Sequence, residues 1–385
     1  MRLKIGVLWI TTALLAVAAV PEPPTSWIDP ATGHRVVRLS RDPDSHSFYF
    51  NVNAYTAAGD LMVFTTRAGV NTLDLRTHDI HLVVPGPTAN LVLAAKTRTL
   101  YYRRGAEIEA TQLDTQATRT VATLPANWQQ GAGLTINADE TELGGSATLL
   151  TPGQPAWAPP PGQAMFVARA AAHLPMVLYT VTIGTGKIAA FYHDDHWLNH
   201  VQFSPTDPTL MLFCHEGPWD KVDRIWTIRT DGSGLRLVHR RTMPMEIAGH
   251  EFWSPDGKIV WFDLQTPRSR QFWLAGKVLA TGREIRYRLT RDEWSVHFNI
   301  SPNEKEFAGD GGGPQNVAHA ENGQWLYLFR PRHGVLQAEK LVNMARQNYH
   351  LEPNVNFTPD GKWIVFRSNM FGPAQILAVE VAKAS

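Results

Sequence analysis

A short pattern recurs seven times along the chain, and it constrains the fold more than any other feature. The pattern is a turn rich in Pro, Asp, Asn or Gly, followed by a short apolar stretch. Because Pro fixes φ and Gly accepts a positive φ, such turns are typical of β-hairpins. The clear copies are FSPTDPTLMLF at 203, WSPDGKIVWF at 253, ISPNEKEFAGD at 300 and FTPDGKWIVF at 357, and the weaker ones are TAAGDLMVF at 56, AAKTRTLYY at 94 and INADETELGGS at 136.

The spacing of these copies predicts a seven-bladed β-propeller. Successive copies begin roughly 38 to 67 residues apart, which is the range of propeller blades once insertions are allowed. The composition agrees, because 44% hydrophobic residues, with 13 Trp and 16 Phe, supply a large core. The 26 Pro and 29 Gly favour many turns over long helices. We therefore expect an all-β chain.

An N-terminal strand is expected to close the ring of blades. Residues 34–39, HRVVRL, alternate as a strand does and stand apart from the first repeat. The last repeat is followed by only one further clear strand, Gln375 to Val381, so its blade lacks an outer strand. We expect Arg35 to Leu39 to supply that strand and remove the exposed sheet edge.

The rest of the chain is expected to form one domain, residues 21–385. The segment 152–161 contains five prolines, which cannot donate a ladder of backbone hydrogen bonds. We interpret it as a connecting loop or insertion and not as a domain boundary.

Residues 1–20 have the pattern of a secretory signal peptide. Arg2 and Lys4 precede an apolar run from Ile5 to Val17, small residues surround Ala18, and prolines follow at once. We expect a periplasmic or secreted protein without a membrane attachment after cleavage. The single cysteine, Cys214, excludes an internal disulfide framework.

The balance of charges excludes a global attraction to polyanions. Lys and Arg number 36 and Asp and Glu 35, for a formal net charge of +1. No overall field therefore draws the chain to nucleic acid or to anionic lipid, and neither is expected as a partner. An anionic ligand would have to be recognised by local groups.

Histidines enter four successive repeats at the same structural level. His200, His250, His297 and His350 precede innermost strands, which converge on the central channel of a propeller. A single histidine of this kind is more often a hydrogen-bonded structural residue. Their recurrence favours a shared site for a metal or for acid–base chemistry.

The segment between Cys214 and Gly257 adds charged and aromatic groups to this set. His215 and Glu216 lead into a loop that carries Trp219 and reaches Arg224. We interpret His215, Glu216 and Trp219, together with His200, as substrate-positioning residues. Trp219 offers a flat face for a sugar ring, although packing inside a blade is the more frequent role of tryptophan.

Metal ligands are expected near the start of the last repeat. Gln347, His350 and Glu352 are spaced as Gln-x-x-His-x-Glu, and together with His297 they offer nitrogen and oxygen donors. That mixture suits Mn²⁺ or Ca²⁺ better than a structural Zn²⁺ site, with Zn²⁺ left open.

Five stretches of the chain carry a resemblance to a known family. They are HVQFSPTDPTLMLFCHEGPWDKVDRIW, GHEFWSPDGK, VHFNISPNEKEFAGDGG and EPNVNFTPDGKWIVFRSNMFG, and more loosely SFYFNVNAYTAAGDLMVF. In these stretches the chain resembles the oligogalacturonate lyases, which are seven-bladed propellers that cleave short pectin fragments. The resemblance implies that His250 is the general base, that Arg224 is catalytic and that His297 binds the metal. The remaining ligands have two registers, which give either Glu352 and Asn354 or Gln347, His350 and Glu352.

The chemistry that this resemblance implies is β-elimination at a uronate in an acidic oligosaccharide. A divalent cation neutralises the uronate carboxylate and acidifies the C5 proton, which His250 removes. The planar cation of Arg224 holds a carboxylate or stabilises developing negative charge. Two alternatives stay open: a lyase for another uronate-containing oligosaccharide, and a non-catalytic propeller of the TolB type that binds a protein. The sequence leaves the oligomeric state open.

Overall fold

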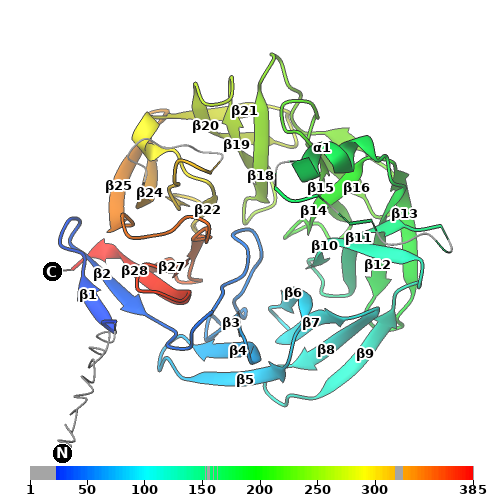
Figure 1. Cartoon of the computed structure of the whole chain (residues 1–385), viewed down its shortest axis with the longest axis horizontal. Helices are drawn as coiled ribbons and strands as arrows, with labels where there is room; N and C mark the ends of the chain where they lie inside the picture. The colour runs from blue at the N-terminus through cyan, green and yellow to red at the C-terminus, as the bar shows by residue number, and fades with distance from the viewer. Residues whose placement is uncertain are drawn as a thin grey trace, which may run out of the picture.

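Seven β-sheets stand around a central axis in the computed structural model of the chain (Figure 1). The structure describes residues 23–151, 153, 157–158, 160–162, 164–316 and 324–384. The predicted all-β, seven-bladed propeller is confirmed. Residues 1–20, predicted to be a signal peptide, lie outside the described residues. No described helix is both long and apolar enough to cross a membrane.

Each sheet is an antiparallel meander of consecutive strands, apart from the one that joins the two ends of the chain. The first sheet contains β3 (Leu61–Thr66), β4 (Gly69–Asp74) and β5 (Ile80–Pro85), the second β6 (Ala89–Ala94), β7 (Thr99–Arg104), β8 (Glu107–Gln112) and β9 (Thr118–Thr123), and the third β10 (Trp128–Ile136), β11 (Glu142–Leu149), β12 (Met176–Thr182) and β13 (Ile188–Asp194). The fourth contains β14 (Trp197–Phe203), β15 (Leu210–Glu216), β16 (Ile225–Arg229) and β17 (Arg236–Leu237), and the fifth β18 (Ile247–Trp253), β19 (Ile259–Gln265), β20 (Phe272–Val278) and β21 (Glu284–Leu289). The sixth contains β22 (Phe298–Ile300), β23 (Phe307–Gly309), β24 (Trp325–Arg332) and β25 (Val335–Asn343), and the seventh β26 (Asn356–Phe357), β27 (Trp363–Ser368), β28 (Gln375–Lys383), β2 (His34–Arg38) and β1 (Ser26–Ile28).

The seven recurrent turns occupy equivalent places, because each leads into the second strand of its meander. In the first sheet the innermost strand is reduced to two isolated bridges to β3, between Tyr55 and Met62 and between His46 and Thr65. The turn after β18 shows why the pattern needs glycine: Gly257 has φ +69°, and a Cβ there would lie 2.2 Å from Oγ1 of Thr206 in the neighbouring turn. The turns therefore pack against one another, and we call the end of the propeller that they form the turn face.

Apolar side chains fill the spaces between neighbouring sheets. Leu212, Val260 and Phe262 belong to one such core, between the fourth and fifth sheets. Val36 and Leu326 belong to another, between the sixth and seventh sheets. The hydrophobic core is therefore a ring of interfaces around the channel and not a single central cluster.

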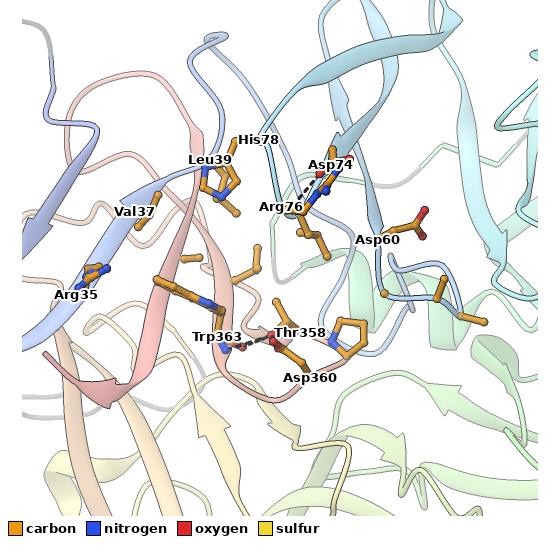
Figure 2. A pocket seen from close by; sticks show the side chains of 17 residues that line it. Arg35, Val37, Leu39, Asp60, Asp74, Arg76, His78, Thr358, Asp360 and Trp363 are labelled. Carbon is orange, nitrogen blue, oxygen red and sulfur yellow. Dashed lines mark hydrogen bonds between the residues drawn. The ribbon is translucent and has the colours of Figure 1, made fainter.

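The N-terminal strand closes the ring, as the sequence predicts. β2 pairs antiparallel with β28, so that Val36 faces Val379 and Arg38 faces Leu377. β1 adds a fifth strand outside β2, which the sequence pattern did not indicate. A cleft of about 910 Å³ opens where the first and last sheets meet, and Figure 2 shows Trp363, Leu39 and Arg76 among its walls. Residues of the turn face line this cleft.

The proline-rich segment lies in a long connection between β11 and β12. Its described part carries the helix α1 (Ala164–Ala171), which the proline content did not predict. Arg169 of α1 is buried, donates a hydrogen bond to Thr148 at 3.1 Å and lies over the ring of Trp197. Apart from α1, the described residues include only one short 3₁₀ helix, Arg291–Glu293.

The β2–β28 pairing should contribute strongly to stability. Val36→Ala removes two buried methyl groups at the closing seam and should lower the free energy of unfolding by roughly 2–3 kcal/mol. Urea denaturation measures the change. Arg35→Ala on the same strand is the matched control, because that side chain is 51% exposed and its ion pair with Glu380 spans 3.6 Å. Equal stability of Val36→Ala and the wild type would contradict closure by this strand.

Candidate active site

The candidate site lies in the central channel, on the face opposite the turn face. An N-terminal segment, residues 48–53, takes the place of the missing innermost strand and runs into the channel (Figure 1). The ring of Phe50 stacks on that of His297 at 4.7 Å and meets that of His250 edge-on at 6.0 Å. Asn299 and Asn354 hold the Phe50 backbone by hydrogen bonds of 3.0 and 3.3 Å. The sequence analysis named no residue of this segment, because its strand pattern is broken.

β-bulges turn two of the predicted histidines toward this segment. The register of β14 against β15 shifts between Asn199 and Gln202, and that of β18 against β19 shifts between Gly249 and Phe252. His200 and His250 occupy these bulges with φ of +49° and +47°. A bulge in the left-handed region re-aims one side chain at the cost of local strain, a feature frequent at functional sites.

His250 is buried and oriented by a carboxylate from the next strand. Its Nδ1 lies 3.0 Å from Oδ1 of Asp263, and its ring centroid lies 4.6 Å from that of His297. Burial alone would lower the pKa of His250, but the charge and hydrogen bond of Asp263, with a smaller effect of Glu352, raise this pKa above its ordinary value. When Nδ1 carries a proton for Asp263, Nε2 of the neutral ring has the free lone pair.

His297 has the same arrangement one sheet further on. Its Nδ1 lies 2.8 Å from Oδ2 of Asp310, which also accepts the backbone N–H of Asn354 at 3.2 Å. The other nitrogen, Nε2, lies 3.2 Å from the hydroxyl of Tyr49 and 3.7 Å from a carboxylate oxygen of Glu352. A carboxylate behind Nδ1 is the usual support of a metal-binding histidine.

Arg224 is placed differently from the expected substrate-binding arginine. Its side chain has no exposed surface and forms an ion pair with Glu216, while Glu251 lies 3.8 Å from its other terminal nitrogen. Burial alone would raise the pKa of Glu216, but Arg224 holds this pKa below its usual range. Burial likewise opposes ionisation of Glu251, but His200 and Arg224 lower the pKa of Glu251 to about 2. The single charge of the guanidinium is therefore shared between two buried carboxylates, with His200 beside them.

Trp219 separates Arg224 from the channel. Its ring centroid lies 4.4 Å from the guanidinium and 5.1 Å from the ring of His250, and its Nε1 donates to Glu216 at 2.9 Å. Gly249 makes room for this ring, since a Cβ there would lie 2.6 Å from Trp219. The glycine of the GHEFW motif therefore has a packing role beside the base candidate.

Three of the predicted residues are not brought to the site. His215 points away from Glu216, as successive residues of a strand do, and burial lowers the pKa of His215 to about 4. His350 is exposed in a turn. The side-chain amide of Gln347 donates to the Leu351 carbonyl at 2.6 Å and accepts from Ser368, at the end of β27, at 2.8 Å, so both of its ends are occupied.

The donors around His297 fit a hard divalent cation held by few protein ligands. Nε2 of His297 and the half-exposed carboxylate of Glu352 face each other, whereas the amide oxygen of Asn354 accepts a hydrogen bond from Phe50. Such cations keep several water or substrate oxygens as ligands. His200, Cys214 and Glu251 also lie close together, but burial raises the pKa of the Cys214 thiol and Arg224 lies beside it. Because Gln347 and His350 lie elsewhere, the geometry favours the register of Glu352 and Asn354, with Glu352 as the carboxylate that faces His297.

The buried ion pairs predict a large structural cost for losing Arg224. Arg224→Met leaves Glu216 and Glu251 buried without their cation, and the free energy of unfolding should fall by about 3–5 kcal/mol. Urea denaturation at neutral pH measures this change. The exposed Arg268→Met is the control and should alter stability by no more than about 0.5 kcal/mol. An Arg224→Met variant as stable as the wild type would mean that the guanidinium is not the counter-ion of these carboxylates.

Comparisons with known proteins place the chain in a family. The family model described as oligogalacturonate lyase matches residues 23–384. An oligogalacturonate lyase of Dickeya dadantii (strain 3937) is 27% identical over 380 residues, covering 91% of this chain and 94% of its own. An oligogalacturonide lyase of Pectobacterium atrosepticum is also 27% identical, with the same coverage.

Solved structures show the same fold. A structure of oligogalacturonate lyase in complex with manganese superposes with a TM-score of 0.83 at 24% identity, covering 93% of this chain and 96% of that one. The oligogalacturonate lyase of Vibrio parahaemolyticus gives a TM-score of 0.82 at the same identity and coverage. The match of the family model over nearly the whole chain confirms the resemblance seen in the sequence: the chain belongs to the oligogalacturonate lyase family.

Proposed function

We propose that this protein cleaves oligogalacturonate by β-elimination, with His250 as the general base. The observation that carries the proposal is the buried His250–Asp263 pair, which orients an imidazole in the channel beside the metal-ligand candidate His297. A positioned base and an adjacent electrophilic group are what proton abstraction next to a carboxylate requires. Membership of the oligogalacturonate lyase family supports this choice of substrate.

The chain's own residues have distinct roles in this proposal. His250 accepts the C5 proton at Nε2, and Asp263 holds the tautomer and stabilises the imidazolium that forms. The electron pair of the C5–H bond forms the C4=C5 double bond as the glycosidic C4–O bond breaks, and the leaving oxygen takes a proton from solvent. Trp219 presents one face toward the channel, where it packs on the sugar and excludes water. Arg224 is a positioning residue, because it holds Trp219 and Glu216 in place from behind.

His297 and Glu352 are proposed to hold a divalent cation in this reaction. When bound, the cation neutralises the uronate carboxylate and so acidifies the C5 proton. The manganese complex of the solved relative makes Mn²⁺ the first ion to test, with Ca²⁺ second because the donors are hard.

Export to the periplasm or to the medium is part of the proposal. It is supported by the charged, apolar and small-residue order of residues 1–20. Pectin fragments are anionic and do not cross membranes unaided, so an exported lyase would meet them directly.

A different uronate oligosaccharide remains the second candidate substrate. Its support is the chain's departure from the family pattern at the metal ligands, where Glu352 and Asn354 stand in one register in place of two histidines. A non-catalytic protein-binding propeller of the TolB type has less support, because it has no need for two buried His–Asp pairs that converge in the channel.

His250→Ala should abolish lyase activity while the fold is retained. A positioned base contributes about 10²–10⁴-fold, so turnover should fall by at least that factor. Ultraviolet absorbance of the unsaturated product, followed over a panel of uronate oligosaccharides, measures the loss. His333→Ala is the control, since His333 is exposed in the turn between β24 and β25.

The pH profile gives a second test of His250. A base must be deprotonated, so the raised pKa predicts that kcat/KM increases with pH through a midpoint above the ordinary value of about 6.5. Asp263→Asn removes the charge that raises this pKa and should move the midpoint to lower pH. Wild-type turnover in His250→Ala, or an unmoved midpoint in Asp263→Asn, would assign the base to another residue.

Cation binding should depend on His297 and Glu352 and not on His350. Calorimetric titration of chelator-treated protein with Mn²⁺ should show a binding step that is lost in His297→Ala and weakened at least tenfold in Glu352→Ala. His350→Ala is the matched control and should bind as the wild type does, because its ring is exposed in the turn. Loss of the step in His350→Ala alone would favour the other register.

A further inference from the structure

A second cluster of metal-binding side chains lies outside the channel, at the junction of the third and fourth sheets. β13 ends at Asp194, the turn continues through Asp195 and His196, and β14 begins at Trp197. His215 lies at the end of β15, where its backbone partner on β14 is Leu198. Because Glu216 points into the channel network, the preceding side chain of His215 points out of it, toward this turn.

The donor atoms of the cluster already lie close to one another. Nδ1 of His196 lies 2.7 Å from Oδ1 of Asp194, and Nε2 of His215 lies 3.4 Å from Oδ2 of the same carboxylate. One donor atom from each of the three residues falls within 4.8 Å of the other two. Tetrahedral zinc, with bonds of about 2.0–2.2 Å, places neighbouring ligand atoms roughly 3.3–3.5 Å apart, so small side-chain movements are sufficient.

One of these donors has no hydrogen-bond partner among the described residues. Nε2 of His215 is buried, the side chain is only 10% exposed, and its approach to Asp194 does not have the geometry of a hydrogen bond. Natural structures rarely leave a buried polar atom unsatisfied, because its desolvation is not compensated. The ring of His215 stacks on that of His196 at 4.5 Å with an angle of 7°, so both imidazoles lie beside the same carboxylate. The half-exposed ring of His196 has to rotate out of this stack for both lone pairs to meet at one ion.

The surroundings of the cluster resemble the outer support of a metal site. The hydroxyl of Tyr192 donates to Oδ2 of Asp194 at 2.5 Å, and the backbone N–H of His196 donates to Oδ1 at 3.0 Å, so the carboxylate is held in place. Asp195 lies 3.5 Å from His196 and 3.3 Å from His173, at the end of the insertion that carries α1. His196 is about half exposed, which leaves an entry path and room for a water ligand.

We propose that Asp194, His196 and His215 form a second metal site, for a borderline divalent cation of the zinc class. Two imidazoles and one carboxylate, with a water as the fourth ligand, suit Zn²⁺ better than Mn²⁺ or Ca²⁺, which prefer oxygen donors. The ion joins the turn before β14 to the end of β15 and so ties the third sheet to the fourth. It acts as a structural clip, independent of the lyase chemistry in the channel.

Zinc binding by tag-free, chelator-treated protein tests the proposal. Calorimetric titration with Zn²⁺ should show a step that is lost in His196→Ala and His215→Ala. Zn²⁺ at a hundredfold excess over Kd should raise the Tm of the wild type by about 3–4 °C, and should not do so in either variant. His196→Ala alters a half-exposed side chain and should fold even where His215→Ala does not.

Two controls separate this site from other sources of zinc binding. His193→Ala removes an exposed histidine next to Asp194 that belongs to the opposite face of β13, and it should bind Zn²⁺ as the wild type does. The His297→Ala, Glu352→Ala double variant should also keep the Zn²⁺ step, so that failure of the channel site and failure of this site are distinguishable. The proposal is overturned if the wild type shows no Zn²⁺ step, or if that step survives in both His196→Ala and His215→Ala.

Discussion

The pairing of β2 with β28 is the interaction on which the rest of the structure depends. A propeller has no central core, and each sheet is packed only against its two neighbours, so the ring must be joined at one seam. Here the joint is a ladder of backbone hydrogen bonds between the two ends of the described chain. The groups of the candidate site come from different sheets: His200 from the fourth, His250 from the fifth, His297 just before the sixth and Glu352 just before the seventh. Their mutual distances are fixed only when the ring is closed.

The same electrostatic arrangement is repeated around the channel. An imidazole within or just before an innermost strand meets a carboxylate within or just after the second strand of the same sheet, in the pairs His250–Asp263 and His297–Asp310. Both pairs are buried, so the charges act through a low-dielectric medium. The carboxylate selects the tautomer and the orientation of the ring, and one sheet is thereby suited to base chemistry and the next to metal binding. Arg224 has a different role in this region. Its positive charge stabilises the ionised carboxylates of Glu216 and Glu251, which are buried beside the channel.

The two candidate metal sites differ in donor hardness and in location. The channel site combines one imidazole with a half-exposed carboxylate and leaves room for substrate oxygens. The outer cluster has two imidazoles and a carboxylate that are already in mutual contact. A hard ion that turns over substrate needs vacant coordination positions, whereas an ion that joins two sheets needs a set of protein ligands. One chain can therefore accommodate both without competition for the same cation.

The sequence by itself determined the number of sheets, the closing strand and the level at which the histidines enter the channel. Those features follow from local patterns, since a turn such as SPDG with an apolar strand after it specifies a hairpin wherever it occurs. The family motifs likewise predicted roles for His250 and His297.

Only the tertiary structure decided which side chains meet. The bulges that rotate His200 and His250, the entry of Tyr49 and Phe50 into the channel, the burial of Arg224 behind Trp219 and the outward direction of His215 all depend on strand register and on packing between sheets. The spacing of Gln347 and His350 indicated ligands, but Leu351 and Ser368 occupy the Gln347 amide and the His350 ring is exposed in a turn. Local sequence fixes the order of the strands, but the direction of each side chain is settled where sheets distant in sequence pack together.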